Sequence, residues 1–288
     1  MGALDGKVAV ITGGTRGLGL AMAQAFLADG AAVVVGSRNP ASVETALTLL
    51  RTGGSRIDGL AVDVAEPEQV RRLGALALER FGGLDVWVNN AGLSAPYGAT
   101  MHVDPQDFLT VVQTNILGTY WGSREAMRAF LPRGSGKLIN VLGRGSNGPV
   151  AYQNAYAASK AWMRSFTLSL AKEYRQSGIG VFGFLPGMVR TDMLIRPTAI
   201  AGFEDRLGVM ETIVRMWAQD AKIPAQRAVW LASSATDGQT GRIVRAAGMG
   251  WMLRGALREG WQRLSRAQQE QFGVAVEVRP AALPTMER

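Results

Sequence analysis

The sequence predicts an α/β fold: a single parallel sheet, doubly wound, with helices packed on both faces. Short apolar runs rich in β-branched residues, such as 8–11 and 31–36, alternate with stretches of helical periodicity along most of the 288 residues. No linker, internal repeat or low-complexity segment divides the chain, so its length fits one large domain. Parallel strands end at a common edge of such a sheet, and ligands gather there.

The composition narrows the possible functions. Hydrophobic residues make up 47% and charged residues 19%, which is typical of a globular protein. There is no cysteine, and the single histidine, His102, excludes a His-rich metal site, so we expect no metal. The net charge of +8 suits an anionic ligand such as a phosphorylated cofactor. Outside the C-terminal segment the arginines are scattered, so we do not expect nucleic-acid binding.

Membrane association and export are not expected either. No apolar run approaches the ~20 residues of a membrane span. The N-terminus leads directly into the first apolar run, without room for a signal peptide, so the sequence predicts a cytoplasmic protein.

The first strand, residues 8–11, leads into a glycine-rich turn. Apolar residues at helical spacing, from Leu18 to Phe26, follow it. Glycines let the backbone approach a ligand, and a helix N-terminus favours anions, so this strand–turn–helix predicts a phosphate site. A glycine turn without a ligand is the alternative. The residues predicted to contact the cofactor here are Gly13, Thr15, Arg16, Gly17, Leu18 and Gly19.

The second strand, residues 31–36, ends at Ser37 and Arg38. The residue at this place meets the adenosine ribose, and a carboxylate there would indicate NAD. Two guanidiniums, those of Arg16 and Arg38, and no carboxylate favour a 2′-phosphate, hence NADP(H). The alternative is that both arginines are merely solvated.

The alternation continues in the same order. Strands are predicted at 57–62, 84–88, 137–142 and 179–185, and helices at 66–81, 108–130 and 154–172. Polar or glycine-containing turns follow three of these strands, at Asp63-Val64, at Asn89-Asn90-Ala91-Gly92 and at Pro186-Gly187.

Tyr156 and Lys160 are four residues apart in the helix at 154–172, so their side chains share one face. A nearby ammonium lowers the pKa of a phenol, which makes the pair a candidate proton-transfer device. A partly buried tyrosine beside a snorkelling lysine is the alternative.

Four motifs in this order resemble the compact short-chain dehydrogenase/reductase family, over roughly residues 5–248. They are the glycine-rich turn at 12–19, Asn89-Asn90-Ala91-Gly92, Tyr156 with Lys160, and the segment from Pro186 to Thr191. Thr240-Gly241 before Ile243-Val244 resembles the family's last strand. The resemblance implies a Rossmann-type sheet spanning a domain at 1–248.

The resemblance also implies an NADP(H)-dependent oxidoreductase that interconverts a carbonyl and an alcohol. Tyr156 would be the general acid or base, Lys160 would hold the nicotinamide ribose and lower the tyrosine pKa, and Asn115 would support a water chain. The resemblance places Asp63 and Val64 at the adenine, Asn89 and Gly92 near the centre of the cofactor, and Val189 and Thr191 at the nicotinamide amide. The other expected cofactor contacts are Ala91, Pro186 and Gly187. A homodimer or homotetramer through the two long helices would be usual.

One position departs from the family. Its catalytic serine lies 13 residues before the tyrosine, and Gly143 stands there. Ser146 could take the role, a backbone N–H or water could donate instead, or the site could do other work. The alternative function is therefore an NADP(H)-binding protein that catalyses non-redox cyclisation or elimination, or serves as a scaffold. This glycine-rich segment also loosely resembles the chlorophyll b reductase branch.

Two further segments lie beyond these motifs. Residues 190–222 are apolar and are expected to cap a site for a bulky, mostly apolar small molecule, with ordinary helix core as the alternative. Residues 249–288 are expected to form a basic amphipathic extension, which packs on its own domain or a second subunit, or contacts a membrane surface. Residues 279–288 are expected to be loose.

Overall fold

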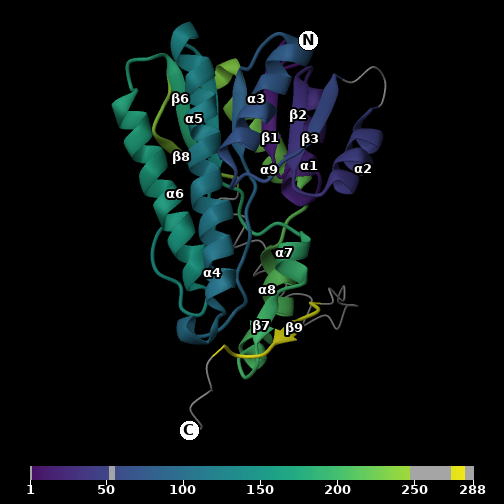
Figure 1. Cartoon of the computed structure of the whole chain (residues 1–288), viewed down its shortest axis with the longest axis vertical. Coiled ribbons are helices and arrows are strands. Elements are labelled where there is room, and N and C mark those ends of the chain that lie inside the picture. The colour runs from purple at the N-terminus through teal and green to yellow at the C-terminus, as the bar shows by residue number, and fades with distance from the viewer. Residues whose placement is uncertain (1, 52–55, 247–273, 283–288) are drawn as a thin grey trace, which may run out of the picture.

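A computed structural model describes residues 2–51, 56–246 and 274–282 (Figure 1). Seven parallel strands form one sheet in the order β3-β2-β1-β4-β5-β6-β8, which confirms the predicted fold. β3 and β4 follow one another in the sequence, but β3 lies at one edge of the sheet and β4 pairs with β1. This reversal of the strand order between β1 and β4 is typical of a doubly wound sheet. The strands are β1 (Val8–Thr12), β2 (Ala32–Ser37), β3 (Ile57–Ala61), β4 (Val86–Asn89), β5 (Gly136–Val141), β6 (Ile179–Leu185) and β8 (Arg242–Arg245).

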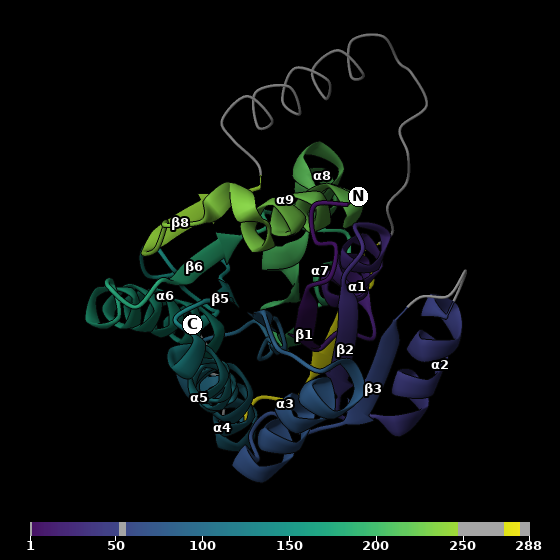
Figure 2. The same cartoon turned by 90° about the horizontal axis from the view of Figure 1, so that it is seen from above.

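Helices cover both faces of the sheet (Figure 2). Because side chains alternate along a strand, Ala9 and Ile11 enter one apolar core and Val8 and Val10 enter the other. The first core is closed by α1 (Gly17–Ala28), α2 (Pro40–Leu50) and α9 (Lys222–Ala232). The second is closed by α3 (Pro67–Phe81), α5 (Gly118–Phe130) and α6 (Asn154–Glu173).

The helix predicted at 108–130 is widened in its middle. It consists of α4 (Pro105–Val111), a π-helical turn (Val112–Leu117) and α5. Asn115 lies in this turn, and its carbonyl accepts a hydrogen bond from Thr119 Oγ1 at 2.7 Å. Such π turns commonly occur at functional sites. Helical periodicity alone does not reveal the extra residue.

The segment predicted as a cap gathers with α4 at one end of the molecule (Figure 1). It contains α7 (Asp192–Ile195), β7 (Thr198–Ile200), a 3-10 turn (Glu204–Leu207) and α8 (Met210–Trp217). Leu207 and Val214 are buried as ordinary core, whereas Met193 is 46% exposed.

Part of the C-terminal extension lies on this cap. The predicted basic helix falls outside the described residues, but β9 (Glu277–Arg279) pairs in parallel with β7. Arg279 also faces Asp107 at 3.6 Å, and Ala282 N donates to the His102 carbonyl at 2.9 Å. The expectation of a loose tail from residue 279 is therefore wrong for 279–282, because strand pairing holds Arg279 and a hydrogen bond to His102 holds Ala282. Within the described ranges, no helix is both long and apolar enough to span a membrane.

Candidate active site

The glycine-rich turn forms an open cradle between β1 and α1. Gly13 and Gly17 have φ values of 63° and 53°, a region that favours glycine. A side chain on Gly19 would overlap the Gly13 carbonyl oxygen. Arg16 is the N-cap residue of α1, but its side chain makes no capping hydrogen bond to the helix. The free end of a twelve-residue helix therefore faces the turn, and these features fit a phosphate group.

Asn90 holds this turn to the end of β4. Its Nδ2 donates to the carbonyls of Thr12 and Gly13, both at 3.0 Å. Thr12 Oγ1 in turn accepts from the backbone N–H groups of Asn90 and Ala91, both at 3.1 Å. Asn90 had no predicted role, although it belongs to the Asn-Asn-Ala-Gly motif and the residues on either side of it are predicted cofactor contacts.

The side chain of Asn89 points away from this cradle. Its Oδ1 accepts from Trp87 Nε1 at 2.8 Å, and its Nδ2 donates to Asn140 Oδ1 at 2.8 Å and Ser123 Oγ at 3.0 Å. It is only 3% exposed. Strand alternation turns this side chain toward α5, so the cofactor contact of Asn89 stays a prediction that only its backbone could meet.

The predicted adenosine-binding residues lie where β2 and β3 end. Ser37 closes β2, and Arg38 is exposed beside it. Asp63 Oδ1 accepts from Ala65 N at 2.9 Å and shapes the turn after β3. Val64 is 5% exposed and lies where a side chain on Gly118 would stand.

Arg16 pairs with Asp192, the first residue of α7. Its guanidinium lies 3.8 Å from the carboxylate of Asp192, and the two side chains are 75% and 59% exposed. An ion pair as exposed as this one contributes little to stability, so Arg16 remains available to an anionic ligand.

Tyr156 and Lys160 share one face of α6, as predicted. Lys160 Nζ lies 5.7 Å from the centre of the Tyr156 ring and donates to the Val141 carbonyl at 2.8 Å. Asn115 Nδ2 donates to Ser159 Oγ at 2.9 Å and to the Leu93 carbonyl at 3.0 Å. The π turn, the loop after β4 and α6 are therefore joined next to Lys160.

Burial shifts the pKa values of both Tyr156 and Lys160. It raises the pKa of Tyr156 to about 12 and lowers the pKa of Lys160 to about 8. The expectation that Lys160 lowers the tyrosine pKa is wrong for this structure. The ammonium is directed at the Val141 carbonyl, and desolvation of the phenol dominates.

Gly143 follows β5 and lies against the phenol. A side chain there would overlap Tyr156 Oη and come within 3.2 Å of Tyr156 Cζ and 3.4 Å of Lys160 Cγ. A tight turn then brings Ser146 N to the Gly143 carbonyl at 3.2 Å. Ser146 is 6% exposed, and its Oγ has no hydrogen-bond partner among the described residues. Ser146 is therefore near Gly143 but does not hydrogen-bond Tyr156.

The segment from Pro186 to Thr191 forms the opposite wall. Gly187 has a φ of 81°, and Thr191 Cγ2 lies 3.0 Å from where a Gly17 side chain would begin. Val189 pairs with Gln219, a residue that the sequence analysis did not single out. Gln219 lies 30 residues farther along the chain, and no motif marks it.

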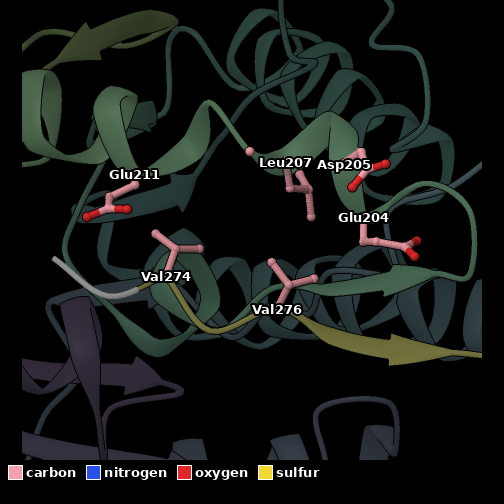
Figure 3. Close-up of a pocket in the computed structure, with 7 residues that line it drawn as sticks. Glu204, Asp205, Leu207, Glu211, Val274 and Val276 are labelled. Atoms are coloured by element: carbon pink, nitrogen blue, oxygen red, sulfur yellow. The ribbon is translucent and has the colours of Figure 1, made fainter.

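A cavity of about 350 Å³ lies in the cap, away from these residues (Figure 3). It is lined by Leu207, Gly208, Val274 and Val276, with Glu204, Asp205 and Glu211 also contributing. None of the predicted site residues lines it. The part of the chain that the structure describes contains no side-chain group suited to a metal ion.

Comparison with known proteins agrees with this architecture. The family model described as short chain dehydrogenase matches residues 7–199. A probable chlorophyll(ide) b reductase of Oryza sativa is 32% identical over 269 residues, covering 85% of this chain. The chain spans about half of that relative, 52% of its length.

Two further matches extend over nearly the whole of the other protein. A 3-oxoacyl-[acyl-carrier-protein] reductase of Haemophilus influenzae is 30% identical over 246 residues, 85% of this chain and 98% of that protein. A variant of the actinorhodin polyketide ketoreductase, solved with NADPH, aligns with a TM-score of 0.76 and 28% identity over 85% of this chain and 97% of that one. On this evidence, together with the parallel sheet and the Tyr156–Lys160 site, the chain belongs to the short-chain dehydrogenase family of oxidoreductases.

Proposed function

We propose that the protein is an NADP(H)-dependent oxidoreductase that interconverts a carbonyl and an alcohol on a bulky, mostly apolar small molecule. The observation that carries this proposal is the position of Tyr156 and Lys160. They lie where β5 ends, next to the loop after β4, and Asn90 ties that loop to the glycine-rich cradle. A dinucleotide laid along this edge would bring its nicotinamide beside the phenol.

NADP(H) suits the charges along this edge. The cradle at Gly13 and Gly17 would hold the pyrophosphate, and Arg16 and Arg38 would hold the 2′-phosphate. Ser37 ends β2, so no carboxylate there selects a free ribose hydroxyl. The NADPH in the related ketoreductase structure supports the same choice.

The chain's own contribution to the reaction is proton transfer and positioning. When bound, NADPH supplies the hydride that forms the new C–H bond at the carbonyl carbon and leaves as NADP⁺. Tyr156 Oη donates its proton to the carbonyl oxygen, which gives the alcohol; in the reverse direction it accepts that proton. Lys160, mostly protonated at pH 7 with a pKa of about 8, would hold the nicotinamide ribose. Asn115 positions the loop through Leu93.

We further propose that Gly143 occupies the place of the family's catalytic serine and that Ser146 supplies the missing donor. A buried hydroxyl without a hydrogen-bond partner, such as Ser146 Oγ, costs roughly 1–3 kcal/mol of stability. A bound substrate oxygen that accepts from Ser146 Oγ would explain why a serine is found there. Its position one tight turn after Gly143 supports this role.

The proposed substrate class rests on the cap. Aromatic rings cluster there, with Tyr152 centred 5.6 Å from both Tyr97 and Phe203. Tyr152 lies in the turn that leads into α6, four residues before Tyr156, so this cluster would border the substrate. Relatives named for 3-oxoacyl and chlorophyll(ide) b reduction support a carbonyl compound of substantial size.

The decisive experiment compares the wild type with Tyr156→Phe against a panel of hydrophobic ketones, following NADPH oxidation. We expect kcat to fall by about 10²–10⁴-fold, since general-acid catalysis contributes that much, while the NADPH Kd stays unchanged. Full turnover by the phenylalanine variant would refute the assignment of Tyr156. NADPH binding without turnover of any ketone by the wild type would refute the proposed reaction.

We also infer a homo-oligomer formed through α5 and α6. Trp162 stacks on Phe166 at 4.8 Å and Tyr120 packs on Trp121 at 4.7 Å, with Tyr120 itself 36% exposed. Light scattering is expected to give a dimer or tetramer for the wild type and a smaller species for Trp162→Glu. A monomeric wild type would contradict the inference.

A further inference from the structure

Gln219 is built into the wall of the proposed nicotinamide site, although it comes from the far end of the cap. It lies between α8 and α9 and is 2% exposed. Its N–H donates to the Met188 carbonyl at 2.9 Å, and its carbonyl accepts from Arg190 N at 3.1 Å. The backbone of Gln219 is thereby fixed alongside Val189.

The nitrogen and the oxygen of the Gln219 side-chain amide differ in their hydrogen bonding. Nε2 donates a short hydrogen bond to the carbonyl of Pro186, the residue that follows β6. This bond identifies the other end as the oxygen. Oε1 is buried and has no hydrogen-bond partner among the described residues.

A buried acceptor without a donor is unfavourable, and each such group calls for an explanation. An apolar side chain of similar size would fill this space without that cost. The orphaned oxygen therefore indicates a donor that arrives with a ligand.

The proposed cofactor offers such a donor. The nicotinamide carboxamide has two N–H bonds, and the segment from Pro186 to Thr191 is where the proposed function places it. We propose that Gln219 belongs to the cofactor site: its Nε2 holds the Pro186 carbonyl, and its Oε1 accepts an N–H of the nicotinamide carboxamide. This assignment rests on the proposed function.

The test measures binding alone. The Kd values of NADP⁺ and of its 3-acetylpyridine analogue are determined by calorimetry for the wild type and Gln219→Met. The analogue keeps the carbonyl of the carboxamide but lacks both N–H bonds. We expect the wild type to prefer NADP⁺ by about two- to tenfold, which corresponds to the about 0.5–1.5 kcal/mol of one such hydrogen bond, and the methionine variant to lose most of that preference.

Two further variants make the result interpretable. Gln219→Asn withdraws the oxygen by one methylene and is expected to lose the preference as well, which covers the case that Gln219→Met does not fold. Gln226→Met, at an exposed glutamine on α9, is expected to leave both affinities unchanged.

An equal preference for NADP⁺ in the wild type and in the Gln219 variants would overturn the role of Gln219. Failure of the wild type to bind NADP⁺ would instead overturn the proposed function, so the two failures are distinguishable.

Discussion

Gly143 and Tyr156 approach so closely that a methyl group on Gly143 would occupy the place of the Tyr156 hydroxyl. The absence of a side chain at Gly143 therefore sets where the phenol oxygen lies. A serine in this position and a tyrosine in its present rotamer exclude each other, so the two side chains would have to rearrange together.

Gly143→Ala tests this relationship. The new methyl group is expected to displace Tyr156 Oη from the carbonyl oxygen, and a displacement of about 1 Å can cost about 10²-fold in rate. The measurement is kcat with NADPH and a ketone that the wild type reduces.

Gly148→Ala is the matched control, because a side chain there meets nothing within 4 Å. It is expected to retain wild-type kcat. An equally active Gly143→Ala variant would show that the hydroxyl position is not critical.

Ser146→Ala tests the proposed substitute for the serine. Removing one donor to a developing oxyanion typically costs about 10²–10³-fold in kcat, and we expect a loss in that range. The melting temperature is expected to stay constant or rise, because the variant no longer buries an unpartnered hydroxyl. A loss of less than about threefold would assign the donor to a backbone N–H or a water molecule.

The sheet and the main features of its edge were predictable because their signals are local. A buried strand, a glycine turn and a Tyr–Lys pair at helical spacing each lie within a few residues. The direction of the Asn89 side chain was not predictable from the motif, because it depends on which face of β4 packs against α5. Gln219 and β9 were missed because their partners, Pro186 and β7, are distant in sequence. The raised pKa of Tyr156 was missed because desolvation depends on packing rather than on spacing.

Arg38→Asp tests the coenzyme preference. A charge-assisted hydrogen bond to a phosphate contributes about 1.5–3 kcal/mol, so NADPH affinity is expected to fall at least about tenfold. NADH affinity is expected to stay constant or rise, since an aspartate can accept from the ribose hydroxyl.

Arg175→Asp, an exposed arginine beyond the end of α6, controls for the change in net charge. Asp192→Asn removes the exposed partner of Arg16 and is expected to tighten NADPH binding by only a fewfold. If Arg38→Asp and Arg175→Asp had the same effect on NADPH affinity, the 2′-phosphate assignment would fail.

Lys160 gives a prediction about stability against pH. Its pKa is lowered from 10.5 to about 8 in the fold, so between these values the unfolded chain binds more protons than the folded one. Stability measured without cofactor is therefore expected to increase with pH across this window, by at most about 3 kcal/mol. Below pH 8 both states are protonated, and this contribution is constant.

Tyr156 sets the upper limit of that window. Its folded pKa is raised from 10.0 to about 12, so above pH 10 the unfolded chain loses its proton first and stability falls. The comparison is therefore urea unfolding between pH 7.5 and 9.5 for the wild type and Lys160→Met. Subtracting the unfolding free energy of the variant from that of the wild type cancels the contributions of the other titrating groups. This difference is expected to increase with pH. Parallel stability curves would mean that the Lys160 ammonium is not desolvated in the folded protein.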